Sequence, residues 1–422
     1  PVLNKKAVEY AAAAGLALGC DVKTRSVMAR KHYVYPDLPK AYQVSQFDKP
    51  LCLGGGMDLS NGRRISLTRI HIEEDAGKLV HVGREVRMDY NRGGVPLIEI
   101  VTEPDFRAAD EVLEYMERLQ TVLRAIGVSD CRMQEGSMRC DVNLSLRLPG
   151  APEYGVRSET KNLNSFTSVA AAIVCEYERQ AEILDNGGTV AQETRGFDAE
   201  TGETSSLRDK ENADDYRYFP EPDIITVVFS EEELERVRAK LPEMPDAKLR
   251  RYVAELGVPG ADAKLLTKYR AVSEYFEAAA DGVTPKTVSG FIVSTMFAHI
   301  TTELERELWN PTVRAERLNE LLRLTEAGTI NRATAKRVYA QMAESGREAG
   351  AFISEADTAG VSPEQLTALC EKAVAENPKS VADYNSGKEK ALQALVGAVM
   401  RETRGRADAS LAEAELKRMI RS

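Results

Sequence analysis

The strongest chemical signal in this sequence is the stretch RIHIEEDAGK, at positions 69–78. Polar residues and isoleucine alternate at its start, which is typical of a strand with two different faces. Three consecutive acids follow: Glu73, Glu74 and Asp75. Adjacent carboxylates repel one another unless a cation neutralises them, so the stretch predicts a cation site. Successive strand residues point to opposite faces, so only one of Glu73 and Glu74 can face a single ion directly.

Two further stretches show the same alternation with a polar face. SMRCDVNLSLR places Asp141 and Asn143 on one face, and VRSETKNLNSF places Glu159 and Lys161 on one face. Taken alone, each stretch is equally typical of a half-exposed sheet. Together with the acids at 73–75 they indicate a Mg²⁺–nucleotide site, in which oxygen ligands hold the ion and cations neutralise the phosphates.

Other candidates have two interpretations each. The amide of Asn162 could orient a substrate. Glu99, in PLIEIVTEPD, is either a site carboxylate or one half of a salt bridge on the strand face. His71 is a metal ligand or a hydrogen-bonded structural histidine. The stretch DYRYFPEPD places Arg217 among aromatic residues, which suits stacking on a base or ribose, and a solvated turn is the alternative.

The C-terminal stretch NPKSVADYNSGKEKALQALVGAVMRETRGRAD combines an apolar helical face with basic residues. A basic edge on a small helical module suits the phosphate backbone of RNA, and a solvated helix surface is the alternative. The residues that we expect to contact RNA are Lys379, Lys388, Lys390 and Arg404.

Composition limits the classes of function. The chain has 422 residues, a net charge of -10 and a pI near 5.3, which argues against sequence-independent coating of nucleic acid. Its six cysteines form no C-x-x-C pair, so we expect buried, reduced thiols in a cytoplasmic protein. No run approaches the ~20 apolar residues of a membrane span. The P-loop, H-E-x-x-H and G-x-S-x-G motifs are also missing.

The candidate site residues must be held in place by helices and strands, which the sequence periodicity predicts. Periodicity predicts helices at 4–18, 107–127 and 165–186, with short strands between them at 25–105, 131–136, 137–148 and 155–163. Beyond about residue 231 nearly every segment has helical periodicity. The fold class is therefore α+β, a strand-rich part followed by a helical one.

The motifs above resemble one protein family. RIHIEEDAGK, DYNRGGVPLIEIVTEPD, SDCRMQEGSMRCDVNLSLR, SETKNLNSF, QETRGFD and DYRYFPEPD occur in the order and spacing of the B subunit of the glutamyl/aspartyl-tRNA amidotransferases. The C-terminal stretch resembles the YqeY-type tail of that family, so the resemblance covers the whole chain. It implies a mostly antiparallel cradle with flanking helices at 1–240, a helical domain at 241–356 and the tail domain at 357–422.

The resemblance also implies an activity. The B subunit uses ATP and Mg²⁺ to phosphorylate the side-chain carboxylate of tRNA mischarged with Glu or Asp. Ammonia from the glutaminase, which is the A subunit, then forms the amide, giving Gln-tRNA(Gln) or Asn-tRNA(Asn), and a small C subunit joins the two. Such a transfer needs positioning and charge neutralisation more than a covalent nucleophile. Whether this chain acts on Glu-tRNA, Asp-tRNA or both stays open, and we expect no DNA or membrane partner.

The resemblance assigns roles to residues of this sequence. The catalytic residues are Glu74, Glu159 and Lys161. The Mg²⁺ ligands are Glu73, Glu74, Asp141 and Glu159. The contacts to substrate or ATP are Arg139, Asn143, Asn162 and Arg217.

The sequence departs from the family pattern at its start. Relatives carry an upstream segment with a G-L-E-[IV]-H-V motif and a zinc-binding cysteine cluster, and neither is in this sequence. We therefore expect an incomplete Mg²⁺ shell, no zinc site, and weak activity or none. A catalytically inactive tRNA-binding scaffold is the alternative function. A ligase acting on a small molecule is a weaker alternative, because it would not need the helical tail.

Overall fold

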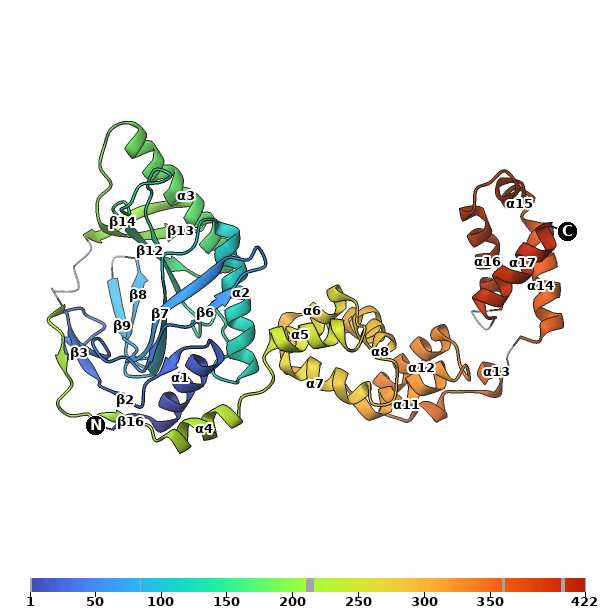
Figure 1. Cartoon of the computed structure of the whole chain (residues 1–422), viewed down its shortest axis with the longest axis horizontal. Coiled ribbons are helices and arrows are strands. Elements are labelled where there is room, and N and C mark those ends of the chain that lie inside the picture. The colour runs from blue at the N-terminus through green and yellow to red at the C-terminus, as the bar shows by residue number, and fades with distance from the viewer. Residues whose placement is uncertain (1, 84, 210–215, 359–360, 404–406, 422) are drawn as a thin grey trace. The chain divides into compact units, whose positions relative to one another are not determined.

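The structure, a computed structural model, describes residues 2–83, 85–209, 216–358, 361–403 and 407–421. It divides the chain into two compact units, Pro1–Pro245 and Asp246–Ser422 (Figure 1). Strands occur in the first unit, and in its described part the second unit is helical. The mixed helix and sheet content and the helical C-terminal half confirm the predicted class. The division at residues 241 and 357 stays a prediction.

The first sheet of unit 1 is built around the long strand β7, which ends on the predicted acids. Its strands are β1 (Asp21–Val22), β5 (Cys52–Leu53), β7 (Arg64–Glu74) and β10 (Pro96–Thr102), in this order, with β6 (Gly56–Asp58) also pairing β7. Strand β10 runs antiparallel to β7 and sets His71 opposite Glu99 and Glu73 opposite Leu97. Directly opposed side chains share a face, so this register brings His71 and Glu99 together.

The second sheet carries the other predicted site residues. It has the order β11 (Cys140–Leu144), β12 (Ser158–Leu163), β13 (Glu193–Asp198) and β14 (Glu203–Asp209). Strands β12 and β13 run parallel, and the other pairs are antiparallel. Smaller sheets join β15 (Phe219–Pro220), β3 (Ala29–His32) and β4 (Tyr42–Ser45), pair β16 (Val227–Val228) with β2 (Arg25–Ser26), and pair β8 (Lys78–Val82) with β9 (Glu85–Asp89).

One hydrophobic core connects the two main sheets with the helices of unit 1, which are α1 (Lys5–Ala17), α2 (Ala109–Ala125), α3 (Phe166–Asp185) and α4 (Glu231–Ala239). Helices α2 and α3 lie side by side (Figure 1). Asn4 caps α1 and Ser165 caps α3, each by accepting backbone N–H groups of the first turn. The three predicted helices are confirmed to within two residues at each end.

The predicted strand at 131–136 is wrong, because this segment is a turn. Gln120 of α2 donates to the carbonyl oxygen of Cys131 at 2.8 Å, and Arg124 donates to that of Asp130 at 2.6 Å. Cys131 has a left-handed backbone, with φ of 51°. The side chains of α2 thus bind the carbonyl groups that a strand would offer to a neighbour.

Unit 2 contains two separate hydrophobic clusters, one over residues 252–349 and one over residues 366–416. Among the described residues no helix is both long and apolar enough to cross a membrane. The first helices of unit 2 are α5 (Pro245–Ala254), α6 (Gly260–Thr267), α7 (Arg270–Ala279), α8 (Pro285–Phe291), the π-helix η2 (Ile292–Met296), α9 (Phe297–His299), α10 (Glu303–Leu308), α11 (Ala315–Glu326) and α12 (Arg332–Ser345). The others are the 3-10 helix η3 (Ala349–Ala351), α13 (Glu355–Thr358), α14 (Pro363–Glu376), α15 (Pro378–Asn385), α16 (Lys390–Glu402) and α17 (Ala409–Arg421).

Candidate active site

The three consecutive acids at the end of β7 face three different groups. Glu73 Oε2 lies 3.6 Å from His71 Nε2 and accepts from the Ser45 hydroxyl at 3.3 Å. Glu74 is paired with Lys40 and accepts the Val44 backbone N–H at 2.9 Å. These two glutamates point to opposite faces, as the strand alternation predicts.

His71, Glu73 and Glu99 form a compact group, here called the β7 triad. The His71 Nε2 atom lies 2.9 Å from Glu99 Oε2, and one ligand atom of each of the three residues lies within 4.8 Å of the others. Within the described part of the chain, it is the one group of three such side chains close enough to hold a metal ion. His71 and Glu73 are buried, whereas the Glu99 side chain is 49% exposed.

The charges of the triad are coupled. Burial lowers the pKa of His71, but its hydrogen bonds with Glu73 and Glu99 outweigh burial and raise that pKa. The Glu99 carboxylate is only half buried; this partial burial raises its pKa, but the bond to His71 and the charges of His71, Lys31 and Arg69 hold the pKa well below its ordinary value. Arg69 Nε also donates to His71 Nδ1 at 3.3 Å, which leaves Nε2 directed at the two carboxylates.

Aromatic residues of the predicted substrate loop pack against the rings of Tyr33 and Phe47. The Tyr218 ring stacks on Phe47 with centroids 4.3 Å apart, and Tyr216 meets Tyr33 edge-on at 5.9 Å. Burial raises the pKa of Tyr218, and the charges of Glu73 and Glu99 raise it further. Arg217 is exposed and has a left-handed backbone, with φ of 44°.

A second group, here called the Lys161 cluster, lies on the second sheet. Lys161 Nζ is 2.8 Å from Asp141 Oδ2 and 3.9 Å from Glu159 Oε2. Thr194 of β13 donates to Glu159 Oε2 at 3.2 Å. Asn143 stands opposite Glu159 in the β11–β12 register. This cluster therefore contains its own permanent cation between the two acids.

Asn162 lies next to this cluster in a strained conformation. Its φ is 66°, and the β11–β12 pairing shifts register at this point. A Cβ added to Gly196 of β13 would lie 3.1 Å from Asn162 Nδ2, so the glycine leaves room for the amide. Non-glycine residues with such backbones are concentrated at functional sites.

One ion pair joins the ends of the two sheets. Arg139, just before β11, donates to both carboxylate oxygens of Asp75, just after β7, at 3.1 and 2.6 Å. Asp75 is buried, and Arg92 also approaches it at 3.3 Å. The fold thus brings the Glu74 end of β7 close to the start of the strand that carries Asp141.

The structure regroups the predicted ligands. Glu73 lies with His71 and Glu99, while Asp141 and Glu159 lie with Lys161. Sequence reasoning left Glu99 out of the predicted metal ligands. Strand alternation does place His71 and Glu73 on the same face of β7. That Glu99 joins them depends on the register between β7 and β10, which alternation does not reveal.

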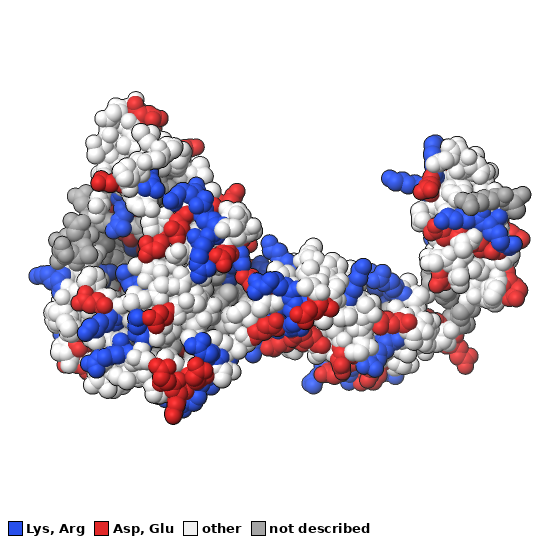
Figure 2. Space-filling view, viewed as in Figure 1, with Lys and Arg blue, Asp and Glu red and all other residues white. Residues whose placement is uncertain are grey.

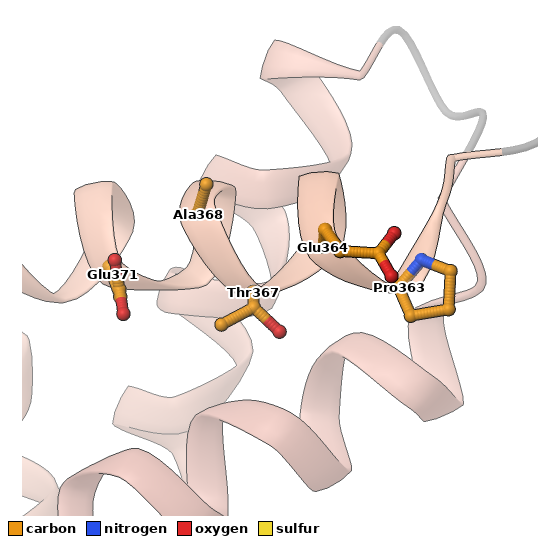
Figure 3. A pocket seen from close by; sticks show the side chains of 5 residues that line it. All are labelled: Pro363, Glu364, Thr367, Ala368 and Glu371. Carbon is orange, nitrogen blue, oxygen red and sulfur yellow. The ribbon is translucent and has the colours of Figure 1, made fainter.

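Of the predicted RNA contacts, Lys379 lies in α15, Lys390 begins α16, and Lys388 lies in the turn between these two helices. Lys379 and Lys390 are exposed, and Lys388 Nζ is 2.9 Å from Asp383. Arg404 lies outside the described residues. Across the face in Figure 2, Lys and Arg are interleaved with Asp and Glu in each unit. A hollow on α14 (Figure 3) is lined by two glutamates and does not suit a phosphate; its lining residues are Pro363, Glu364, Thr367, Ala368 and Glu371.

Comparisons with known proteins define the class. Residues 1–235 match the family described as "GatB/GatE catalytic domain", and residues 274–420 match the family described as "GatB domain". The chain therefore belongs to the GatB family.

Curated relatives agree with this class. The chain is 46% identical over 417 residues to a protein of Caldanaerobacter subterraneus subsp. tengcongensis, covering 97% of this chain and 88% of the relative. It is 47% identical over 420 residues to one of Caldicellulosiruptor saccharolyticus, with the same shares. It is 44% identical over 417 residues to one of Geobacillus thermodenitrificans, covering 97% and 87%. Each is named as the B subunit of an aspartyl/glutamyl-tRNA(Asn/Gln) amidotransferase.

Proposed function

We propose that this chain is the ATP- and Mg²⁺-dependent B subunit of a tRNA-dependent amidotransferase. It phosphorylates the side-chain carboxylate of Glu-tRNA(Gln), Asp-tRNA(Asn) or both, and the acyl phosphate then reacts with ammonia. The observation that carries this proposal is identity of 43% or more to relatives of that name over 97% of the chain. Similarity of this extent, with the acids of both clusters in place, favours an enzyme over an inactive tRNA-binding scaffold.

The β7 triad suits a divalent cation. Glu73 and Glu99 supply carboxylate oxygens, the donors that Mg²⁺ prefers, and His71, whose Nδ1 accepts from Arg69, carries its proton on Nε2 and orients both carboxylates. Glu73 is 9% exposed, yet its contacts, 3.3 Å to Ser45 and 3.6 Å to His71, are long. Its oxygens are therefore available to another cation. When bound there, Mg²⁺ would neutralise phosphate charge and orient the nucleotide.

The remaining predicted residues act on the reacting groups. A substrate carboxylate oxygen forms a bond to the γ-phosphorus, ADP leaves, and ammonia later displaces phosphate from the carbonyl carbon. Lys161 and Arg139 supply charge to the phosphoryl oxygens, and Asn143, Asn162 and Arg217 orient substrate or ATP. Asp141 and Glu159 hold Lys161 in place.

Glu74 and Glu159 keep their catalytic assignment as carboxylates that can accept the proton lost when the amide forms. Both are partly buried, with side chains 17% and 16% exposed. Glu74 stands on the face of β7 opposite the triad, so we assign it to the ammonia side of the reaction rather than to the metal.

The partners follow from the chemistry. Ammonia must come from a glutaminase, the A subunit, with a small C subunit joining the two, and the RNA ligand is the mischarged tRNA, reached by Lys379, Lys388 and Lys390. We place the reaction in the cytoplasm. We also propose the cradle, helical and tail domains at 1–240, 241–356 and 357–422, which the separate hydrophobic clusters support.

The test combines this chain with its A and C partners and measures phosphate release from ATP in Mg²⁺, with and without Glu-tRNA(Gln) or Asp-tRNA(Asn). We expect mischarged tRNA to stimulate release, and Glu159→Ala to abolish the stimulation. Glu85→Ala, at an exposed hairpin position, is the matched control. Binding of tRNA without stimulated release by the wild type would instead establish the scaffold.

A further inference from the structure

The inference concerns how β7 is held at its acidic end. Strand β5 pairs with β7 at two positions, Cys52 with Ile70 and Leu53 with Arg69. On the other side, β10 continues to Glu74. Alternate strand residues direct their backbone groups to opposite sides. The backbone N–H and C=O groups of Ile72 and Glu74 therefore point to the side of β7 on which β5 lies, but β5 ends before it reaches them. Buried backbone groups at these positions need other hydrogen-bond partners.

Two glutamine side chains take the place of the missing strand. Gln46 Oε1 accepts the backbone N–H of Ile72 at 3.0 Å, and Gln43 Nε2 donates to the backbone carbonyl of Glu74 at 2.8 Å. These bonds fall on the residues either side of Glu73. Both glutamines are buried, with 6% exposure for Gln43 and 1% for Gln46.

The two residues between the glutamines bind the same strand end. Val44 donates its backbone N–H to the Glu74 carboxylate, and Ser45 donates its hydroxyl to the Glu73 carboxylate. Residues 43–46 thus make four consecutive bonds to the last three residues of β7. Gln43 Oε1 also accepts from the Tyr33 hydroxyl at 3.3 Å, and Tyr33 contacts Tyr216 of the predicted substrate loop.

We propose that Gln43 and Gln46 are positioning residues that fix Glu73 relative to His71 and Glu99, and so set the affinity of the β7 triad for a divalent cation. This inference rests on the proposed function. Neither side chain is offered as a metal ligand. Each acts through the backbone next to Glu73, so its loss displaces the carboxylate without removing it.

The backbone partners fix the orientation of each amide, because an N–H requires an acceptor and a carbonyl requires a donor. The same substitution should therefore have opposite effects at the two positions. Gln46→Glu retains the oxygen that binds Ile72 N–H, and burial at 1% exposure favours its neutral, protonated form, so it adds no charge beside Glu73. Gln43→Glu removes the N–H group that binds the Glu74 carbonyl and places an oxygen against it.

The experiment measures Mg²⁺ binding by calorimetry, and tRNA-stimulated phosphate release against Mg²⁺ concentration in the complex with the A and C partners. We expect Gln43→Glu and Gln46→Met to weaken Mg²⁺ binding about 10-fold and Gln46→Glu to stay within about 3-fold of wild type. The matched control is Gln120→Glu, which removes the same kind of bond, 2.8 Å to a backbone carbonyl, on α2. It should leave Mg²⁺ binding unchanged.

Equal Mg²⁺ affinity in all variants would overturn the proposal, as would equal losses for Gln46→Glu and Gln46→Met. Gln43→Met, which removes the donor without adding charge, replaces Gln43→Glu if the latter does not fold. If neither Gln43 variant folds while Gln120→Glu does, the role is structural and the proposal fails. Lack of tRNA stimulation in the wild type would instead count against the proposed function.

Discussion

Glu73 and Glu176 are both buried glutamates of the first unit, but their carboxylates have different surroundings. Glu176, on α3, is 1% exposed. It accepts from Ser158 at 2.5 Å, from Gln180 at 2.9 Å and from Arg179 at 2.6 and 2.9 Å. Glu73 has one hydroxyl at 3.3 Å and a histidine nitrogen at 3.6 Å.

The difference separates a structural carboxylate from one that is available for binding. Burial raises the pKa of Glu176, but the hydrogen bonds from Arg179, Ser158 and Gln180 outweigh burial and lower it. A carboxylate whose oxygens are fully occupied gains little from another cation, whereas a buried one with long contacts can still accept a metal ion. Substitutions at the two positions should therefore affect different properties of the protein.

The largest effect should come from Glu73→Gln. An amide keeps the size of the side chain but removes the charge that would hold a metal ion, so tRNA-stimulated phosphate release should fall roughly 1,000-fold. The melting temperature should change by less than about 2 °C, because the lost contacts are long. Stopped-time assays of phosphate release with the partner subunits measure the rate, and thermal unfolding measures the melting temperature. A wild-type rate in this variant would show that Glu73 is not part of the active site.

Glu176→Gln should show the reverse pattern. It removes one of the two buried acids that pair with Arg179 and with the nearby Arg195, which lies 3.4 Å from the carboxylate, and leaves both arginines to Glu193. The free energy of unfolding should fall by about 3 kcal/mol, as for other broken buried ion pairs. Urea unfolding of the whole chain tests this, with Glu178→Gln, at an exposed position of α3, as the control. A loss below about 1 kcal/mol would show that the network does not stabilise unit 1.

Sequence patterns could predict this comparison only in part. Period-two alternation places Glu73 and Glu74 on opposite faces and Glu159 with Lys161 on one face, because strand geometry is local. The partnership of His71 with Glu99 depends on a strand register that is set by the intervening hairpin and turn. Alternation at 131–136 is misleading, because side chains of α2 bind the carbonyl groups there.

Lys161→Met should have a smaller effect than Glu73→Gln. It removes the cation between Asp141 and Glu159 and, by our proposal, one of two charges on the phosphoryl oxygens. We expect kcat for stimulated phosphate release to fall about 30-fold. Lys161→Arg should recover part of the rate, since it restores charge with a different geometry. An unchanged kcat in Lys161→Met would show that the Lys161 cluster has no role in catalysis and is only a half-exposed ion pair on the sheet.

The smallest effect that we expect is a pH dependence in the contribution of Glu176 to the free energy of unfolding. Its folded pKa is lowered, so the group binds fewer protons in the folded state than in the unfolded state near pH 4. The stabilisation is therefore complete above the ordinary glutamate pKa of about 4.3 and is lost as the pH falls through the folded pKa.

The stability gap between wild type and Glu176→Gln should thus be constant from pH 8 to pH 6 and narrow below about pH 4. Urea unfolding of both proteins at pH 7.5, 5.0 and 4.0 measures the gap, and taking the difference cancels carboxylates that the two proteins share. A gap that widens as the pH falls would mean that the pKa of Glu176 is higher in the folded protein than in the unfolded chain. Its surroundings would then stabilise a neutral carboxyl group, and the contrast with Glu73 would have to rest on burial alone.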